Sequence, residues 1–231
     1  MWGWASALVA LAFACPAMAE TRITAAQLSL PTDRYDHAIL GDGVEWGGLD
    51  LTVEEGGQTK TLRITLPETR VFEDITARLA DVTGDGAPEV IVVETDIAKG
   101  ASLAIYGPKG KIAATPHIGQ THRWLAPAAI ADFDGDGVQD IAYVDRPHLL
   151  RELVFVRLTG GKLTEFARLP DLTNHRIGDK TITSTTRDCG AGPEVVLPNA
   201  DWTRLMAATP KGAQDIGPFT KSAIIKAKSC P

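Results

Sequence analysis

Residues 131–144 have the sequence ADFDGDGVQDIAYV, an acidic loop followed by an apolar stretch typical of a β-strand. Positions 1, 3, 5 and 9 of the loop are aspartates: Asp132, Asp134, Asp136 and Asp140. Carboxylates this close together repel one another unless a cation neutralises them, and oxygen ligands at alternate loop positions are typical of calcium sites. Gly135 and Gly137 allow the backbone to fold around an ion, and the Val138 carbonyl is placed to supply a further ligand. The pattern predicts a calcium site; the alternative is a solvated acidic turn before a strand.

The same pattern occurs fifty-one residues upstream, in residues 80–93 (ADVTGDGAPEVIVV). The equivalent positions are held by Asp81, Thr83, Asp85 and Glu89. An eroded third copy, residues 183–198, keeps the order GPEVV at 192–196 but lacks the acidic loop. A weak fourth echo at residues 37–53 is explained equally well by chance. Self-similarity at a period of about fifty residues predicts a repeat architecture built of supersecondary units.

Each repeat is expected to form four short strands separated by glycine and proline turns. In the best copy the expected strands are residues 125–132, 140–145, 150–158 and 162–169, and in the preceding copy they include 89–95, 102–107 and 111–116. A hairpin with Gly56 and Gly57 at its tip is expected over residues 49–66. No window of a dozen residues shows sustained helical periodicity, so the sequence predicts an almost entirely β chain. Four-stranded units at this period are typical of propeller blades.

The two acidic loops and the strands after them resemble FG-GAP, or VCBS-type, repeats, the calcium-binding blades similar to those of integrin α-subunit propellers. The resemblance is strong over residues 75–170, partial over 181–215 and weak over 33–70. It implies a propeller with calcium on the loop between the first two strands of a blade, and no single activity. The implied ligands are Asp132, Asp134, Asp136, Val138 and Asp140 in one loop and Asp81, Thr83, Asp85, Ala87 and Glu89 in the other. Lower calcium occupancy is expected in the loop of Asp81, because Thr83 is neutral and Glu89 is longer than aspartate.

Residues 1–19 form a short apolar run, MWGWASALVALAFACPAMA, that predicts a secretory signal peptide cleaved before Glu20. A basic n-region is missing, so a misassigned start codon and a non-secreted apolar N-terminus both stay open. The run is short for a transmembrane helix, and Pro16 would interrupt it. Cys15 suggests a lipoprotein, but residues 12–14 lack the leucine that starts a lipobox. We therefore expect a periplasmic or secreted protein.

Cleavage at this position would leave two of the three cysteines, Cys189 and Cys230. An even cysteine count in an exported protein favours a disulfide, and two unpaired thiols are the alternative. The segments 180–189 and 221–230 are alike, and both are expected to form the innermost strand of a blade. The two cysteines would then end equivalent strands in neighbouring blades. Because Cys189 lies where the third copy lacks its acidic loop, the disulfide is expected to stand in for a metal.

Residues 20–231 are expected to form a single domain, a small β-propeller of four four-stranded blades. The count becomes five if residues 21–36 and 219–230 combine into a closing blade. The formal net charge of −6 argues against nucleic acid or an anionic membrane surface as a partner. No transmembrane segment is expected in the mature chain.

The sequence carries none of the common catalytic motifs: no GxSxG elbow, no Walker loop and no HExxH. The five histidines lack metal-ligand spacing and are expected to be surface or loop residues: His37, His117, His122, His148 and His175. A loop containing His117, His122, Arg123 and Trp124 precedes the best calcium motif, and both ligand binding and packing are open for it. Trp46 and Trp202 are expected to pack in the core or between blades.

Two functions from different classes follow. The first, which we expect, is a non-catalytic, calcium-stabilised propeller in the periplasm or outside the cell that presents loops to a protein or glycan partner. The second is a propeller enzyme of the lyase or phosphatase type, with the acidic loops as structural metal sites. Propellers have both kinds of role, so the fold alone does not decide. An inward-facing cluster of histidine, arginine and acidic residues would favour the enzyme, and a smooth channel with an exposed aromatic patch would favour binding.

Overall fold

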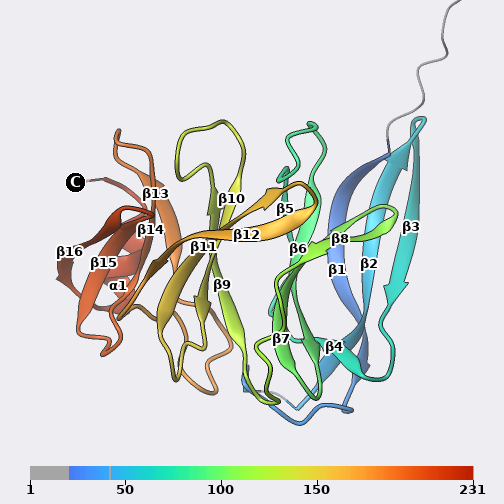
Figure 1. Ribbon diagram of the computed structural model, residues 1–231, viewed down its shortest axis with the longest axis horizontal. Helices are drawn as coiled ribbons and strands as arrows, with labels where there is room; N and C mark the ends of the chain where they lie inside the picture. Colours follow the sequence, from blue (N-terminus) through green and yellow to red (C-terminus); the bar gives the residue numbers. More distant parts are fainter. Residues whose placement is uncertain (1–20, 42, 231) are drawn as a thin grey trace, which may run out of the picture.

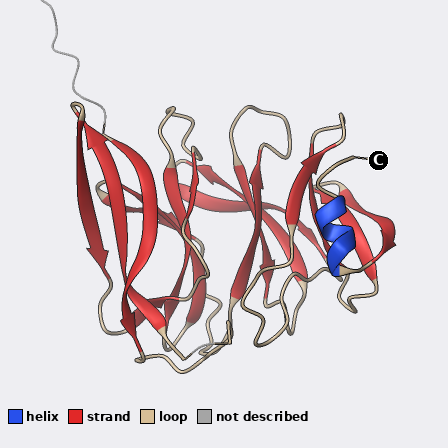
Figure 2. Ribbon diagram, turned by 180° about the vertical axis from the view of Figure 1, so that it is seen from behind, coloured by secondary structure: helices blue, strands red, loops and turns tan. Residues whose placement is uncertain are grey.

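The computed structural model describes residues 21–41 and 43–230. In this part of the chain, one short helix accompanies an otherwise all-β structure of antiparallel sheets (Figures 1 and 2). The all-β prediction is confirmed. The predicted signal peptide, residues 1–19, lies outside the described residues.

The first strands form an antiparallel sheet at one end of the molecule. β1 (Arg22–Thr32) pairs with β2 (Glu45–Glu55), which pairs on its other side with β3 (Gln58–Thr65). The β2–β3 turn falls at residues 56 and 57, as the hairpin signal predicts. The short β4 (Arg70–Phe72) bonds both to β2 and to β6 of the next unit. This bridge makes one continuous sheet of β1 to β8.

Three four-stranded antiparallel units follow, each with its strands paired in sequence order. Their strands are β5 (Arg78–Ala80), β6 (Glu89–Asp96), β7 (Gly100–Gly107) and β8 (Gly110–Ala114); β9 (Leu125–Ala131), β10 (Asp140–Asp145), β11 (Glu152–Thr159) and β12 (Lys162–Leu169); and β13 (Thr185–Asp188), β14 (Pro193–Pro198), β15 (Arg204–Thr209) and β16 (Gly212–Pro218). In the second unit the strands agree with the predicted ranges to within two residues at each end. The four-stranded repeat plan is confirmed for these units.

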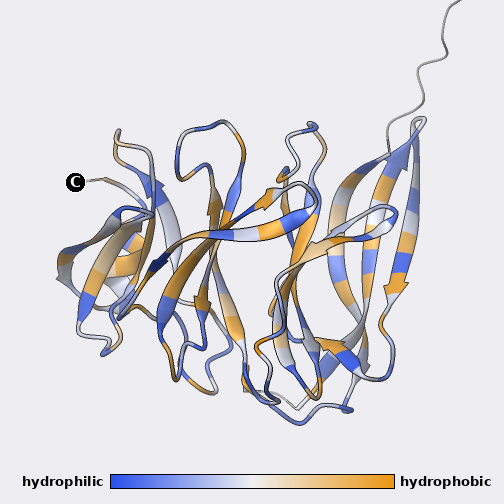
Figure 3. Cartoon of the chain, viewed as in Figure 1, coloured by the Kyte–Doolittle hydropathy of each residue, from blue (hydrophilic) through white to orange (hydrophobic). Residues whose placement is uncertain are grey.

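The core lies between the faces of neighbouring sheets. β6, β7 and β10 are buried along their whole length, because the sheets on both sides cover them, and Figure 3 shows hydrophobic stretches along the middle strands. One cluster joins the first and second units through Ile91, Leu103 and Ile141. The flanking clusters join the N-terminal sheet to the first unit and the second unit to the third. Stacking of sheet faces therefore holds the units in a row.

The row of sheets is open in the described part of the chain. β1, β2 and β3 lie at one end of the molecule, and the third unit lies at the other (Figures 1 and 2). A closed propeller is not shown. The prediction that residues 21–36 and 219–230 combine into a closing fifth blade is wrong, because β1 pairs with β2 and residues 221–226 are helical.

The helix α1 (Lys221–Lys226) replaces the strand expected over residues 221–230. Thr220 caps it, since the Thr220 side chain accepts a hydrogen bond from the Ala223 N–H at 2.9 Å. The likeness to residues 180–189 is misleading here, because residues 185–188 form strand β13 whereas the Thr220 cap begins a helix. No helix in the described ranges is long and apolar enough to cross a bilayer.

Candidate metal centre

The loop between β9 and β10 gathers three carboxylates. Asp132, Asp134 and Asp136 each offer an oxygen, and these oxygens lie within 4.8 Å of one another. The backbone turns around Asp132, whose carboxylate accepts hydrogen bonds from the Gly135 N–H at 2.7 Å and the Gly137 N–H at 2.8 Å. Both glycines have positive φ angles, 82° and 89°, and residues with a side chain rarely adopt this backbone conformation. Hydrogen bonds from the loop, that of Gly137 above all, lower the pKa of Asp132.

The last predicted carboxylate ligand, Asp140, lies apart from these three at the buried start of β10. One of its oxygens accepts a hydrogen bond from the Phe133 N–H at 3.2 Å, and the other accepts one from the Arg157 Nε at 3.0 Å. Burial raises the pKa of Asp140. These two donors fix the position of the Asp140 carboxylate at the base of the loop.

Arg157 of β11 reaches into the acidic loop. Its guanidinium lies 2.5 Å from Asp134 Oδ2, 3.2 Å from Asp136 Oδ2 and 3.0 Å from Asp140 Oδ1. The same group lies over the Phe166 ring, 4.5 Å from its centre. Sequence reasoning missed this arginine, although the β10–β11 pairing that sets Val156 opposite Ile141 also carries Arg157 back over the start of β10. A positive group therefore occupies part of the space between the carboxylates.

The donor set of this loop fits a calcium ion. Carboxylate oxygens from Asp132, Asp134 and Asp136 are hard ligands, and the spacing of their oxygens allows one small cation to contact all three. Val138 lies on the same loop and donates its N–H to Asp136 at 2.8 Å. Asp140 does not belong to this group and is bonded to the Phe133 N–H and to Arg157.

The first acidic loop has the same turn but a different arrangement of acids. Asp81 accepts hydrogen bonds from the Gly84 N–H at 2.7 Å and the Gly86 N–H at 2.8 Å, as Asp132 does in its loop. Glu89 accepts hydrogen bonds from the Thr83 N–H and hydroxyl, both at 3.2 Å, and burial raises its pKa. Asp85 accepts one from the Ala87 N–H at 2.9 Å. Among the described residues, the acids of this loop do not gather as those of the second loop do.

The two loops and the strands between them match a known family model, that of the FG-GAP-like repeat, over residues 81–143. Residues 81–143 are therefore similar to an FG-GAP-like repeat. The match begins at Asp81, the first acid of one loop, and ends at Tyr143 in β10, so both acidic loops lie inside it. No curated protein and no solved structure matches the chain.

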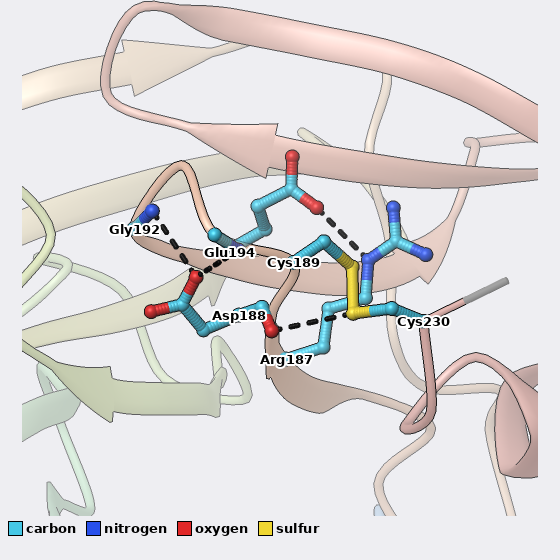
Figure 4. Close-up of a disulfide and its surroundings, with 7 residues drawn as sticks. Arg187, Asp188, Cys189, Gly192, Glu194 and Cys230 are labelled. Carbon is cyan, nitrogen blue, oxygen red and sulfur yellow. Dashed lines mark hydrogen bonds and ion pairs between the residues drawn. A yellow bond between two sulfur atoms is a disulfide. The ribbon is translucent and has the colours of Figure 1, made fainter.

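Beyond the FG-GAP-like repeat, the third unit retains a shortened loop. Asp188 accepts hydrogen bonds from the Gly190 N–H at 2.8 Å and the Gly192 N–H at 3.2 Å, so it holds the first position of the turn (Figure 4). Seven residues, 188–194, replace the nine of residues 132–140. The expectation that the acidic loop is wholly absent is therefore wrong at its first position. Sequence comparison missed Asp188 because the deletion shifts it out of register.

The predicted disulfide is confirmed: Cys189 and Cys230 are bonded, with a Cα–Cα distance of 5.5 Å. Cys189 follows β13, and Cys230 follows α1 instead of a strand. The Cys230 sulfur also lies 3.2 Å from the Asp188 carbonyl oxygen (Figure 4). The bond thus ties the C-terminal segment directly to the shortened loop.

Four of the five histidines come together outside the FG-GAP-like loops, on connections between strands. The rings of His37 and His122 lie 5.1 Å apart, and His148 Nε2 lies 3.0 Å from His175 Nδ1. They are loop residues as expected, but His175 is buried and they are not scattered. His117 stands apart, with its Nδ1 bonded to the Gly100 carbonyl. Sequence spacing gives no signal for this cluster, because four separate connections build it.

Proposed function

We propose that this protein is an exported calcium-binding module, built of propeller-type blades, that presents loops to a protein or glycan partner and catalyses no reaction. The observation that carries the proposal is the convergence of Asp132, Asp134 and Asp136 on one loop. The FG-GAP-like repeat over residues 81–143 supports it, as do the three four-stranded units.

Calcium would be held by the Asp132, Asp134 and Asp136 carboxylates, with Val138 through its carbonyl and with Asp140. Its charge would neutralise the loop and fix the β9–β10 turn. The loop of Asp81, Thr83, Asp85, Ala87 and Glu89 would bind more weakly, since Thr83 is neutral and already bonded to Glu89. In both loops the metal would have a structural role, because it would stabilise the turn that begins a buried strand.

The disulfide supports export. A covalent Cys189–Cys230 bond persists in the oxidising periplasm or outside the cell and is rare in the cytosol. The net charge of −6 disfavours nucleic acid as the partner. A protein or glycan that contacts the connecting loops fits these properties.

A second candidate is a propeller enzyme of the lyase or phosphatase type with structural calcium sites. The cluster of His37, His122 and His148 with Arg123 and Arg146 favours it, because acid–base groups and cations meet at one small pocket. Turnover of a phosphoester or glycan that is lost in His122→Ala would establish this candidate over the first.

The proposal is tested by calcium titration calorimetry on residues 20–231 and by thermal unfolding with calcium and with chelator. Calcium at about ten times its dissociation constant is expected to stabilise the protein by about 1.4 kcal/mol. Asp134→Asn should lose most of the binding, whereas the matched control Asp201→Asn, an exposed acid outside both loops, should bind like wild type. No effect of chelator on wild type would show that the metal proposal is wrong.

The partner is tested by pull-down from an envelope extract with calcium and with chelator. A partner retained by wild type with calcium, and lost with chelator and in Asp134→Asn, would support the binding role. Recovery of equal amounts of the partner under all conditions would show that partner binding does not depend on the metal.

A further inference from the structure

A small pocket lies where three connections between strands meet, away from the acidic loops. It measures about 30 Å³, and its polar lining consists of His37, His122, Arg123, Trp124, Arg146 and His148. These residues come from the β1–β2, β8–β9 and β10–β11 connections. The β9–β10 and β10–β11 connections are at opposite ends of β10 (Figure 1), so the pocket and the aspartate loop are separated by a strand length.

Every polar side chain on this lining carries nitrogen, and no carboxylate belongs to it among the described residues. The guanidiniums of Arg123 and Arg146 donate hydrogen bonds, and His37 and His122 donate from their free ring nitrogens in the imidazolium form. In a chain with net charge −6, two guanidiniums on the lining of one pocket are a local concentration of hydrogen-bond donors. Such a lining complements a ligand that only accepts hydrogen bonds.

Carboxylates pair with other nitrogens of the same side chains; Glu73 and Asp145 are buried, and Asp36 is exposed. Glu73 lies 2.5 Å from His37 Nδ1, Asp36 lies 2.9 Å from His122 Nε2, and Asp145 accepts from the Arg146 Nε at 2.8 Å. Each of these bonds leaves a further nitrogen on the same group: Nε2 of His37, Nδ1 of His122 and Nη1 of Arg146. The carboxylates thereby orient these side chains, and the free nitrogen of each of these two histidines donates when the ring is an imidazolium.

Deeper contacts hold the pocket wall rigid. Glu73 is fully buried and accepts a second hydrogen bond, from the Thr95 hydroxyl at 2.6 Å. Trp124 is almost fully buried, and its indole N–H donates to the Glu73 carbonyl at 2.8 Å. His148 lies with its ring nearly parallel to that of Trp124, and its Nε2 is bonded to His175. Donors fixed in this way lose little entropy when a ligand binds.

We propose that this pocket binds a small oxyanion, the phosphate, sulfate or carboxylate group of a ligand. Such a group accepts hydrogen bonds from several directions. Arg123 supplies the positive charge that matches it, and Arg146, already paired with Asp145, supplies a further N–H. The pocket has room for about two water-sized atoms, so such a group would enter it through its oxygens and stay partly outside. Two sources share this chemistry: a free inorganic anion, and an anionic group at the end of a larger molecule whose remainder extends over the exposed Leu149.

The test is calorimetric titration of residues 20–231 with inorganic phosphate and, in a separate arm, with phenyl phosphate. Calcium is removed beforehand on a chelating resin, because soluble chelators are themselves polycarboxylates. Saturable binding is expected in both arms. Tighter binding of phenyl phosphate identifies the end group of a larger ligand as the source, and tighter binding of inorganic phosphate identifies the free anion.

The key variant is Arg123→Gln. Within residues 21–41 and 43–230, the Arg123 side chain donates a hydrogen bond to the neighbouring His122 carbonyl, and Arg123 is not part of the buried core. It is expected to weaken binding about tenfold, as loss of one charge-assisted hydrogen bond does. Arg123→Lys should keep part of the affinity. The matched control Arg22→Gln removes the same charge from an exposed site far from the pocket and should bind like wild type.

Two results would overturn the proposal: no saturable binding by wild type, or equal affinities in Arg123→Gln and Arg22→Gln. Circular dichroism of each variant verifies that it is folded. Asp134→Asn should bind phosphate like wild type, so a failure of the calcium proposal leaves this result unaffected.

Discussion

Arg157 and Asp134 form a 2.5 Å ion pair between strand β11 and the acidic loop. The guanidinium also contacts Asp136 and Asp140, so one positive charge is shared among three of the carboxylates that calcium is proposed to use. Because Arg157 occupies part of the space between these carboxylates, we expect calcium binding to displace it. The loop thus has its own counter-charge when no metal is present.

Arg157→Gln is expected to tighten calcium binding about three- to tenfold and to destabilise the metal-free protein by about 1 kcal/mol, as for a partly exposed ion pair. The competitor for the carboxylates is removed, and their mutual repulsion in the metal-free state is no longer offset. Calorimetry gives the affinity, and urea unfolding in chelator gives the stability. Arg204→Gln, which breaks the exposed pair with Asp215, is the control. Unchanged affinity in Arg157→Gln would contradict competition.

Thr83→Asp should strengthen calcium binding by the loop of residues 81–89. The substitution supplies the acid that the second loop has at this position, next to Asp81 and Asp85. Without metal it places a charge beside Glu89 in place of a hydrogen-bonding hydroxyl, so the variant is expected to be less stable than wild type in chelator and more strongly stabilised by calcium. Thermal unfolding measures both. A variant that is destabilised equally with and without calcium would show that this loop binds no metal.

Loss of the disulfide is expected to cost about 2 to 4 kcal/mol, because the bond closes a long loop in the unfolded chain. The two cysteines are 41 residues apart. Unfolding in urea of Cys189→Ser/Cys230→Ser, compared with wild type under oxidising conditions, measures this cost. Peptide mass mapping without reduction checks the pairing. If wild type shows equal stability with and without reductant, the bond does not stabilise the fold.

The protein should lose stability through His148 as the pH falls from about 6.5 to about 4. Burial, followed by the nearby His175 and His37, lowers the pKa of His148 from 6.5 to about 4, so the unfolded chain takes up a proton at a pH where the folded protein does not. The contribution is fully present above pH 6.5. In His148→Gln the drop in melting temperature between pH 7 and pH 5 should be smaller than in wild type. His117→Gln, remote from the cluster, should keep the wild-type slope.

The strands and their repeat could be predicted from sequence, because both depend on local signals. Alternating turn residues and apolar runs locate β9 to β12 closely, and the acidic spacing identifies the loop that gathers Asp132, Asp134 and Asp136. The disulfide could be predicted from the cysteine count and the expected export.

Other features depend on contacts between distant segments and left no such signal. Arg157 enters the loop through strand register, and the histidine cluster forms only where separate connections meet. α1 was missed because a single capping residue outweighs a β-like sequence. Closure into a ring depends on how far each sheet rotates against the next, and repeat spacing carries no information on that rotation.

The bridge made by β4 has a consequence for cooperativity. Because β1 to β8 share one hydrogen-bonded ladder, opening of the N-terminal strands exposes backbone amides of the first repeat as well. The second and third units form separate ladders and adjoin their neighbours mainly through side-chain packing. Amide hydrogen exchange should therefore divide the chain into one large unit of opening and two smaller ones, with the last held by its covalent tie.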